Sequence, residues 1–353
     1  MKSKAEQSIR RIADIKYRLI LEGTVMGILA GLLISMFRLI LAKAESFRAT
    51  ALNGLLETGS VGTALTATGG LLLCFFCAWI CIKTEPMCAG SGIPQVAGEL
   101  KGKIFQNWWK VIITKLAGAS ATIFAGLSLG REGPSIQLGA MVGKGFSSVK
   151  DNLATEEKLL MTCGAVAGLS SAFSAPLAGV IFALEELHKN FSIDILLGAM
   201  ASSIAADFVA YYIFGLNPVF DLKLTEALPL KFYWTILILG IFLGVFGTLY
   251  GKVVELFQNA YGKIGSKAGR LAVPFALLVP LALFYPHVLG GGYDLVTEIA
   301  EGKFLLGAAA LLLVVKFGFS ILSFASGAPG GIFMPLLVIG LPKIGRASCR
   351  ERV

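Results

Sequence analysis

The pentapeptide GREGP at residues 130–134 places an arginine and a glutamate side by side in the apolar stretch SLGREGPSIQLGA. The order of residue types predicts an abruptly starting helix. Glycine permits close backbone approach, and proline has a preset φ at a position where its missing N–H costs nothing. The residues of this helix start are Gly130, Arg131, Gly133 and Pro134. Glu132 would then lie at the helix N-terminus, where backbone N–H groups attract negative charge.

Two pairs of glycine-rich motifs recur at one spacing along the chain. They are GSGIPQ at 90–95 with GREGP, and GGGYD at 290–294 with GIFMP at 331–335. The interval is 40 residues from Gly90 to Gly130, and it is 40 residues again from Gly291 to Gly331. Both second members have the form G-x-x-x-P. Duplicated interrupted helices in two halves of a chain are typical of the binding site of a transporter.

Four helix starts are therefore expected, and they would converge near the middle of a membrane. They lie at Ser91–Pro94, Arg131–Pro134, Gly291–Asp294 and Ile332–Pro335. Each leaves up to about four N–H groups unpaired, which costs several kcal/mol per group in a bilayer unless an acceptor is present. An anion is the natural acceptor, because partial charges replace its hydration yet release it more readily than a lysine would. Kinks that only shape a helix bundle are the alternative, which explains one motif better than the ordered set.

The composition is that of a membrane protein. Of 353 residues, 56% are hydrophobic and 15% are charged, and the mean hydropathy is +0.76, so the chain has more apolar surface than a soluble protein buries. Three uncharged runs are each long enough to cross a hydrocarbon core of about 30 Å, namely Val61–Ile82, Leu159–Leu184 and Phe232–Gly251. We expect one all-α polytopic domain of about ten or more helical segments, over residues 20–342.

The N-terminal segment, residues 1–19, is basic. The positive-inside bias places it in the cytoplasm, and it does not have the pattern of a signal peptide. The net charge of +9 fits this topology and contact with anionic lipids of the bilayer, and no nucleic-acid signal accompanies it. Six cysteines are present. Cys74, Cys77 and Cys81 share one helical face without a histidine or carboxylate, which favours apolar packing over a metal site.

The last ten residues, IGRASCRERV at 344–353, differ from the apolar run before them. They match one reading frame of a common sequencing-adapter oligonucleotide. We interpret residues 343–353 as a non-native tail, and expect the native sequence to stop near Pro342 and the natural protein to continue. A short basic cytoplasmic tail is the alternative interpretation.

Four stretches, in this order, resemble the CLC family of chloride channels and chloride/proton antiporters, in its prokaryotic type. They are GSGIPQ at 90–95, GREGPSIQ at 130–137, GLSSAFSAPLAGVIFALEE at 168–186 and SGAPGGIFMP at 326–335. The resemblance implies a fold of two inverted halves built from tilted and broken helices, with the second half incomplete here. It also implies a homodimer in the inner membrane of a prokaryote, with an anion pathway in each subunit.

The resemblance assigns roles residue by residue. Ser91 matches the serine whose hydroxyl donates to the anion, with Gly92 and Ile93 beside it, and Ile332 and Phe333 match the pair whose backbone N–H groups contact the anion. Glu132 matches the gating glutamate, and Glu186 matches the internal acid through which antiporters take protons. The central tyrosine of the family would lie beyond residue 342.

The residues themselves leave some alternatives open. Ser91 is also well placed to cap the helix that begins near Pro94, a role compatible with anion binding. Glu185 and Glu186 face about 100° apart on a helix and equally fit an interfacial helix end. Arg131 either pairs locally or lies at the outer aqueous entrance. Glu132 has the clearest mechanism, since its carboxylate competes with an anion for the same N–H groups until it is protonated.

The presence of Glu186 favours chloride/proton antiport, and the GSGIP pattern around Ser91 favours chloride as substrate, with protons as the coupled ion and no further cofactor. A passive voltage- or pH-gated chloride channel of the same fold is the alternative within the family. A non-transporting membrane protein is the alternative outside it. An enzyme is not indicated, because rhomboid and HExxH motifs are missing and His188 and His287 have no catalytic spacing. Because its second half stops early, we expect the chain as written to transport poorly or not at all.

Overall fold

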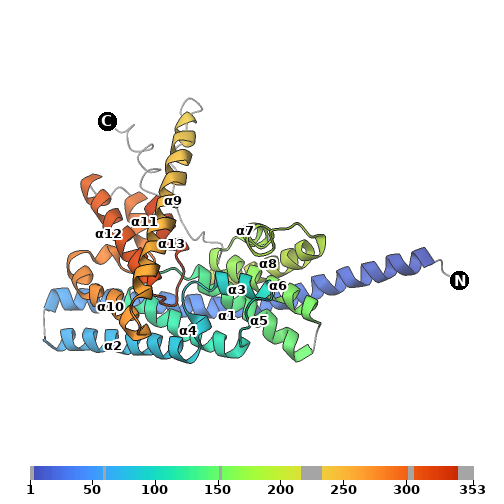
Figure 1. The fold of residues 1–353 in the computed structure, drawn as a ribbon, viewed down its shortest axis with the longest axis horizontal. Coiled ribbons are helices and arrows are strands. Elements are labelled where there is room, and N and C mark those ends of the chain that lie inside the picture. The colour runs from blue at the N-terminus through green and yellow to red at the C-terminus, as the bar shows by residue number, and fades with distance from the viewer. Residues whose placement is uncertain (1–3, 59–60, 151–152, 216–232, 301–305, 341–353) are drawn as a thin grey trace. The chain divides into compact units, whose positions relative to one another are not determined.

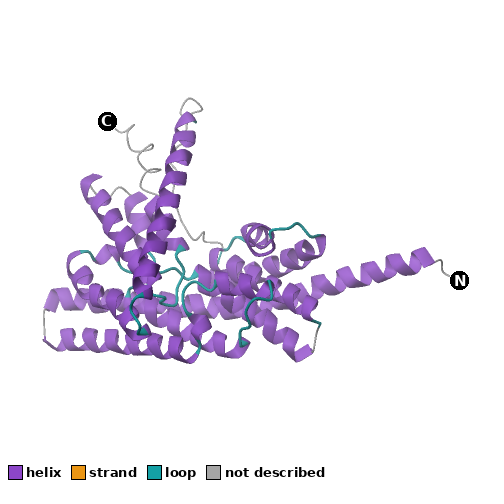
Figure 2. Ribbon diagram, in the orientation of Figure 1, coloured by secondary structure: helices purple, strands orange, loops and turns teal. Residues whose placement is uncertain are grey.

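The computed structural model describes residues 4–58, 61–150, 153–215, 233–300 and 306–340. Within these ranges the protein consists of helices and loops, with no strand (Figures 1 and 2). The α-helices are α1 (Lys4–Thr58), α2 (Val61–Thr84), α3 (Ile93–Leu100), α4 (Trp108–Ala125), α5 (Glu132–Lys150), α6 (Ala154–Phe173), α7 (Pro176–Phe182), α8 (Ile193–Phe214), α9 (Trp234–Gly262), α10 (Lys267–Phe284), α11 (Tyr293–Ala300), α12 (Leu306–Ala325) and α13 (Phe333–Gly340). The short turns η1 (Pro86–Cys88) and η4 (Pro286–Val288) are 3₁₀-helical, and η2 (Ala183–His188) is π-helical. The predicted all-α fold is confirmed.

Six helices of the described chain are long and apolar enough to cross a membrane. The candidate spans are Tyr17–Ala51, Leu65–Thr84, Ile193–Phe214, Trp234–Gly262, Lys267–Phe284 and Gly307–Ala325. The predicted run Val61–Ile82 lies within α2, and the described part of the run Phe232–Gly251 lies within α9. The basic N-terminal segment is not a separate element, because α1 continues from Lys4 into the first apolar span.

One predicted crossing is wrong. The uncharged run Leu159–Leu184 is not a single helix, because α6 ends at Phe173 and α7 begins at Pro176. Ser174 between them has a φ of 53°, in the left-handed region. Ala175 is driven out of the helical region by the proline that follows it. A helix break in an uncharged run leaves no trace in hydropathy.

The chain divides into two compact units. The first unit contains Met1–Ala42, Thr84–Ala117 and Arg131–Val219, and the second contains Lys43–Lys83, Gly118–Gly130 and Phe220–Val353. The starts of α3 and α5 lie in the first unit, and the starts of α11 and α13 lie in the second. Each unit therefore holds the helix starts of one motif pair, while Gly130, the first residue of GREGP, belongs to the second unit.

The core of the first unit depends on close contact between the backbones of α5 and α6. A Cβ added at Gly139 would lie 2.1 Å from the carbonyl oxygen of Gly164, and one at Gly143 would lie 2.1 Å from that of Leu160. Gly168 packs equally closely on α5. Such small-xxx-small spacing lets membrane helices approach until backbones touch. The same device joins α1 to α8, since a Cβ at Gly27 would lie 2.3 Å from Ser202 O.

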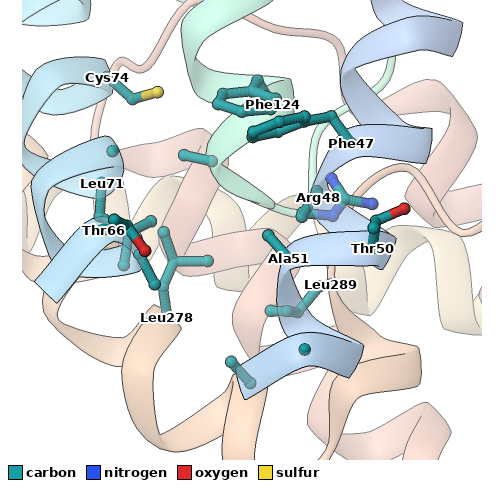
Figure 3. Close-up of a pocket in the computed structure, with 15 residues that line it drawn as sticks. Phe47, Arg48, Thr50, Ala51, Thr66, Leu71, Cys74, Phe124, Leu278 and Leu289 are labelled. Atoms are coloured by element: carbon teal, nitrogen blue, oxygen red, sulfur yellow. The ribbon is translucent and has the colours of Figure 1, made fainter. Parts of the chain in front are cut away.

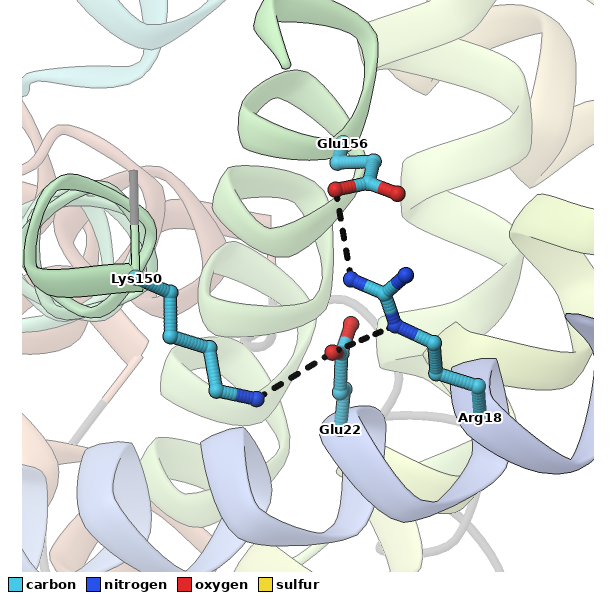
Figure 4. A network of polar contacts seen from close by, with 4 residues as sticks. All are labelled: Arg18, Glu22, Lys150 and Glu156. Atoms are coloured by element: carbon cyan, nitrogen blue, oxygen red, sulfur yellow. Dashed lines mark hydrogen bonds and ion pairs between the residues drawn. The ribbon is translucent and has the colours of Figure 1, made fainter. Parts of the chain in front are cut away.

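In the first unit, ion pairs join α1 to the end of α5 and to the start of α6. Arg18 of α1 contacts Glu22 at 3.0 Å and Glu156 of α6 at 3.3 Å, and Lys150 of α5 contacts Glu22 at 3.2 Å (Figure 4). The Arg18 side chain is 53% exposed, so each pair stabilises by at most about 1 kcal/mol. The network therefore fixes register at a polar end more than it adds stability.

The two units repeat one succession of elements. A 3₁₀ turn of three residues leads through a glycine turn into a helix of eight residues, first as η1 and α3 and again as η4 and α11. The glycine φ angles repeat as well, with 66° at Gly90 and 67° at Gly290. The motif register proposed from the sequence is therefore wrong by one residue, because Gly90 corresponds to Gly290 and not to Gly291.

Candidate functional site

The four expected helix starts are all present. Helices α3, α5, α11 and α13 begin at Ile93, Glu132, Tyr293 and Phe333, each within its predicted range. Pro94, Pro134 and Pro335 lie in the first turns of α3, α5 and α13, where a missing N–H breaks no helical bond. The first N–H groups of each helix have no intrahelical acceptor, so each start presents partial positive charge.

In the first unit, the starts of α3 and α5 meet. A Cβ added at Gly133 would lie 2.8 Å from the carbonyl oxygen of Ser91 and 2.9 Å from its Cβ, so only glycine fits there. Ser91 is 8% exposed, and its Oγ accepts a hydrogen bond of 3.3 Å from the N–H of Ile93. The N-cap residue of α3 is Gly92, so Ser91 accepts this bond from the position before the cap. This bond uses an oxygen lone pair, so the hydroxyl proton is left to donate to an anion.

Glu132 is the first residue of α5 and is 1% exposed. Its carboxylate is therefore carried by the same helix start that adjoins Ser91. The first turn of α5 is stabilised by Ser135, whose N–H and Oγ donate to the carbonyl of Arg131 at 3.0 and 2.9 Å. The half-buried side chain of Arg131 keeps its two predicted roles as predictions.

In the second unit, the two G-x-x-x-P motifs are joined at their first glycines. The N–H of each of Gly130 and Gly331 donates to the carbonyl of the other at 2.7 Å, which forms an isolated antiparallel bridge. Thr122 Oγ1 adds a bond of 2.6 Å to the carbonyl of Pro329. Ile332 is half-buried, and the Phe333 side chain is 48% exposed. The bridge was not predicted, because main-chain pairing has no residue signature.

Glu186 lies apart from Ser91, on the π-helical turn η2. Both Glu185 and Glu186 are exposed, while Leu187 between Glu186 and His188 is buried with Val96 and Leu100 of α3. The turn therefore packs on the helix that follows Ser91. Exposure does not separate the two predicted roles of Glu186, as a proton-accepting acid or as an interfacial residue.

Sequence analysis missed a buried polar cluster in the first unit. Lys144 of α5 forms an ion pair with Glu99 of α3, and both side chains are less than a tenth exposed. Gln106 Nε2 donates to Glu99 at 2.9 Å, and Gln137 Nε2 donates to Gln106 Oε1 at 2.7 Å. Charged residues inside an apolar helix, such as Lys144, were the available signal.

An apolar cavity of about 370 Å³ lies within the second unit (Figure 3). The rings of Phe47 and Phe124 line the cavity, with 5.9 Å between their centroids. Arg48, which also lines it, donates to the carbonyl of Ile123 at 2.8 Å. None of the predicted site residues lines this cavity. Its wall is mainly apolar, with Arg48, Thr50 and Thr66 as the polar side chains, so the candidate site remains the helix starts.

Comparisons with known proteins agree with one another. The model of the family described as voltage gated chloride channel matches residues 69–342. The H(+)/Cl(-) exchange transporter ClcA of Salmonella arizonae is 32% identical over 330 residues, which make up 91% of this chain and 70% of the relative. The protein of the same name from Vibrio parahaemolyticus is 32% identical over 339 residues, with 92% and 71% covered.

Solved structures share the fold. The structure of a slow cyanobacterial Cl⁻/H⁺ antiporter has a TM-score of 0.87 and 26% identity, over 95% of this chain and 80% of that chain. A CLC-type fluoride/proton antiporter has a TM-score of 0.78 at 22% identity, over 92% and 79%, which supports the fold alone. With six candidate spans and a family match over most of its length, this chain is an integral membrane protein that belongs to the CLC, or voltage gated chloride channel, family.

Proposed function

We propose that this protein exchanges chloride for protons across a bacterial inner membrane. The observation that carries the proposal is the buried carboxylate of Glu132 on the helix start that touches the turn of Ser91. A carboxylate in that position and a chloride ion are attracted by the same N–H groups. The relatives named as H(+)/Cl(-) exchange transporters support exchange.

Exchange follows from competition at the helix starts. When Glu132 is charged, its carboxylate takes the place of the anion. When it is protonated, the attraction of the N–H groups for it falls, and chloride enters. The hydroxyl of Ser91 donates to that chloride, with Gly92 and Ile93 beside it. Ile332 and Phe333 supply the N–H groups of the other repeat.

The proton path needs a second acid toward the cytoplasm. Glu186 fits this role, because it is exposed and lies on a turn packed against α3. A passive channel would use the same helix starts without such an acid. The presence of both acids, Glu132 and Glu186, therefore favours coupled exchange over a channel.

Flux into sealed vesicles tests the proposal. Protein expressed from its complete gene is purified and reconstituted in chloride-loaded liposomes, and external pH and chloride are recorded together after dilution into low chloride. We expect the outward movement of chloride to drive proton uptake into the liposomes, although no pH gradient is imposed. Chloride release without proton movement would identify a channel, and the absence of both would refute anion transport.

Assembly and orientation are part of the proposal. We infer a homodimer with one anion path in each subunit, and a cytoplasmic N-terminus set by the basic residues before Tyr17. Chloride, protons and the lipid bilayer are its partners, and no cofactor is needed for exchange.

A further inference from the structure

The turn that precedes α3 is held by side chains along its whole length. Four successive carbonyl groups, from Met87 to Gly90, each accept a hydrogen bond from a side-chain donor. The bonds are Gln137 Nε2 to Met87 O at 2.9 Å, Lys115 Nζ to Cys88 O at 2.9 Å, Gln95 Nε2 to Ala89 O at 2.9 Å and Lys115 Nζ to Gly90 O at 2.7 Å. No carbonyl of this turn is left to rotate freely.

Lys115 supplies the charge in this arrangement. Its side chain is fully buried, and it extends from α4 to two carbonyls of the first unit. A buried ammonium without a carboxylate partner is costly, and here the two carbonyl dipoles compensate it. A lysine in this place is retained against a large desolvation cost, which argues for a use beyond packing.

The second unit repeats the contact. Lys316, also fully buried, donates to Val288 O at 2.8 Å and to Gly290 O at 2.6 Å. These carbonyls hold the places of Cys88 and Gly90 in the turn before α11. Each half of the chain therefore has one lysine that donates to the corresponding pair of carbonyls, although the neighbouring side chains differ.

Because the peptide bond is planar, the direction of each held carbonyl also determines the direction of the N–H of the next residue. In a trans peptide, the C=O of one residue and the N–H of the next point in opposite directions. With Gly90 C=O aimed at Lys115, the N–H of Ser91 must face away from the ammonium. The N–H of Gly291 must likewise face away from Lys316. Rotation of either peptide would present a carbonyl oxygen, which repels an anion.

We propose that Lys115 and Lys316 are positioning residues of anion transport, which fix the direction of the N–H groups that precede α3 and α11. The inference rests on the proposed chloride exchange. The amino groups donate to carbonyls of the two turns, so they act through the turns.

The two turns are not equally supported. Gln95 and Gln137 hold two further carbonyls in the first turn, whereas Leu295 and Val338 take the corresponding places in the second. Loss of Lys115 leaves the carbonyls of Met87 and Ala89 held by Gln137 and Gln95, whereas the corresponding Val338 and Leu295 have no hydrogen-bonding side chain. The structure predicts the larger effect at Lys316.

Chloride binding to purified protein, expressed from its complete gene, tests the inference separately from transport. Lys115→Met and Lys316→Met remove the ammonium at similar volume, and Lys110→Met, on the exposed face of the same α4, removes one positive charge without touching the turn. Folded monodisperse protein is selected by size exclusion, and the chloride Kd is measured by titration calorimetry. We expect the chloride Kd to rise about tenfold in Lys115→Met and by a larger factor in Lys316→Met. In Lys110→Met the Kd should not change.

Selectivity provides the reading that a purely structural role would not change. Misaimed peptides should reduce discrimination between chloride and nitrate, measured as the ratio of their Kd values. Folded Lys115→Met and Lys316→Met proteins with an unchanged Kd and unchanged ratio would overturn the inference. If neither variant folds, Gln95→Leu replaces them, because it removes only the half-buried hydrogen bond to the carbonyl of Ala89. This variant should bind chloride about twofold more weakly, and an unchanged Kd would overturn the inference. Absence of chloride binding by the unmodified protein would instead remove the proposed function itself.

Discussion

At the scale of the residue, ionisable groups in this protein meet backbone dipoles. Glu132 lies among helix-start N–H groups, and Lys115 and Lys316 lie among carbonyls. The positions of Ser91 and Glu132 beside helix starts could be predicted, because glycine and proline around them determine where a helix begins. The contacts of the lysines could not be, since the direction of a carbonyl has no signature in residue type.

Neutralising Glu132 should separate the two ion movements. In Glu132→Gln the side chain no longer carries a proton or competes as an anion, so we expect chloride flux to continue while coupled proton uptake falls at least about tenfold. Paired pH and chloride recordings in liposomes measure this. Glu156→Gln, at a surface ion pair, is the matched control and should leave coupling unchanged. Persistent coupling in Glu132→Gln would contradict the gate.

The adjacent glutamates allow a second, internally controlled test. Glu186→Gln should lower proton uptake about tenfold at near-normal chloride flux, because an internal acid serves only the proton path. Glu185→Gln, one residue earlier on η2, makes the same chemical change and should keep coupling intact. Equal behaviour of the two variants would favour the interfacial interpretation of this pair.

At the scale of the element, helix length and breaks are set by local rules that hydropathy does not record. The starts of α5 and α13, just after Gly130 and Gly331, could be predicted from the spacing of glycine and proline. The break at Ser174 inside an uncharged run was not read, although Pro176 could have indicated it. Close packing of α5 on α6 had a signal as well, in glycines spaced four apart, which sequence analysis did not use.

The α5–α6 contact makes a stability prediction. Leucine at Gly139 would drive its Cβ into the Gly164 backbone, where nothing can give way, so Gly139→Leu should destabilise the protein by about 3 kcal/mol or fail to fold. Gly244→Leu in α9, where the added Cβ has nothing within 4 Å in this chain, is the matched control. Thermal unfolding followed by size exclusion compares them, and equal unfolding midpoints would refute the packing argument.

At the scale of the whole molecule, a duplicated plan was predicted from two motif pairs, and two compact units with the same succession of turns and helices confirm it. The register was one residue wrong, because three adjacent glycines at 290–292 look alike in sequence and differ only in backbone angle. The predicted tail at 343–353 and the boundary at Pro342 lie outside the described residues.

The orientation of the chain is open to direct measurement. A cleavable epitope placed before Met1 should be protected from external protease in right-side-out vesicles and cut in inverted ones, because the basic segment keeps the N-terminus in the cytoplasm. A periplasmic reporter with a known cleavage site is the control for vesicle sidedness. Cleavage in the right-side-out vesicles alone would reverse the proposed topology.

The bridge between Gly130 and Gly331 has a consequence for how this protein tolerates change. Both bonds use main-chain atoms only, so they place no demand on which side chains flank the two glycines beyond leaving room for contact. A mutational scan would detect the requirement for glycine at these two positions, but it would not measure the contribution of the two hydrogen bonds. Their worth becomes measurable only by chemical synthesis, with glycolic acid in place of Gly331, where an ester oxygen replaces the one N–H that Gly130 accepts.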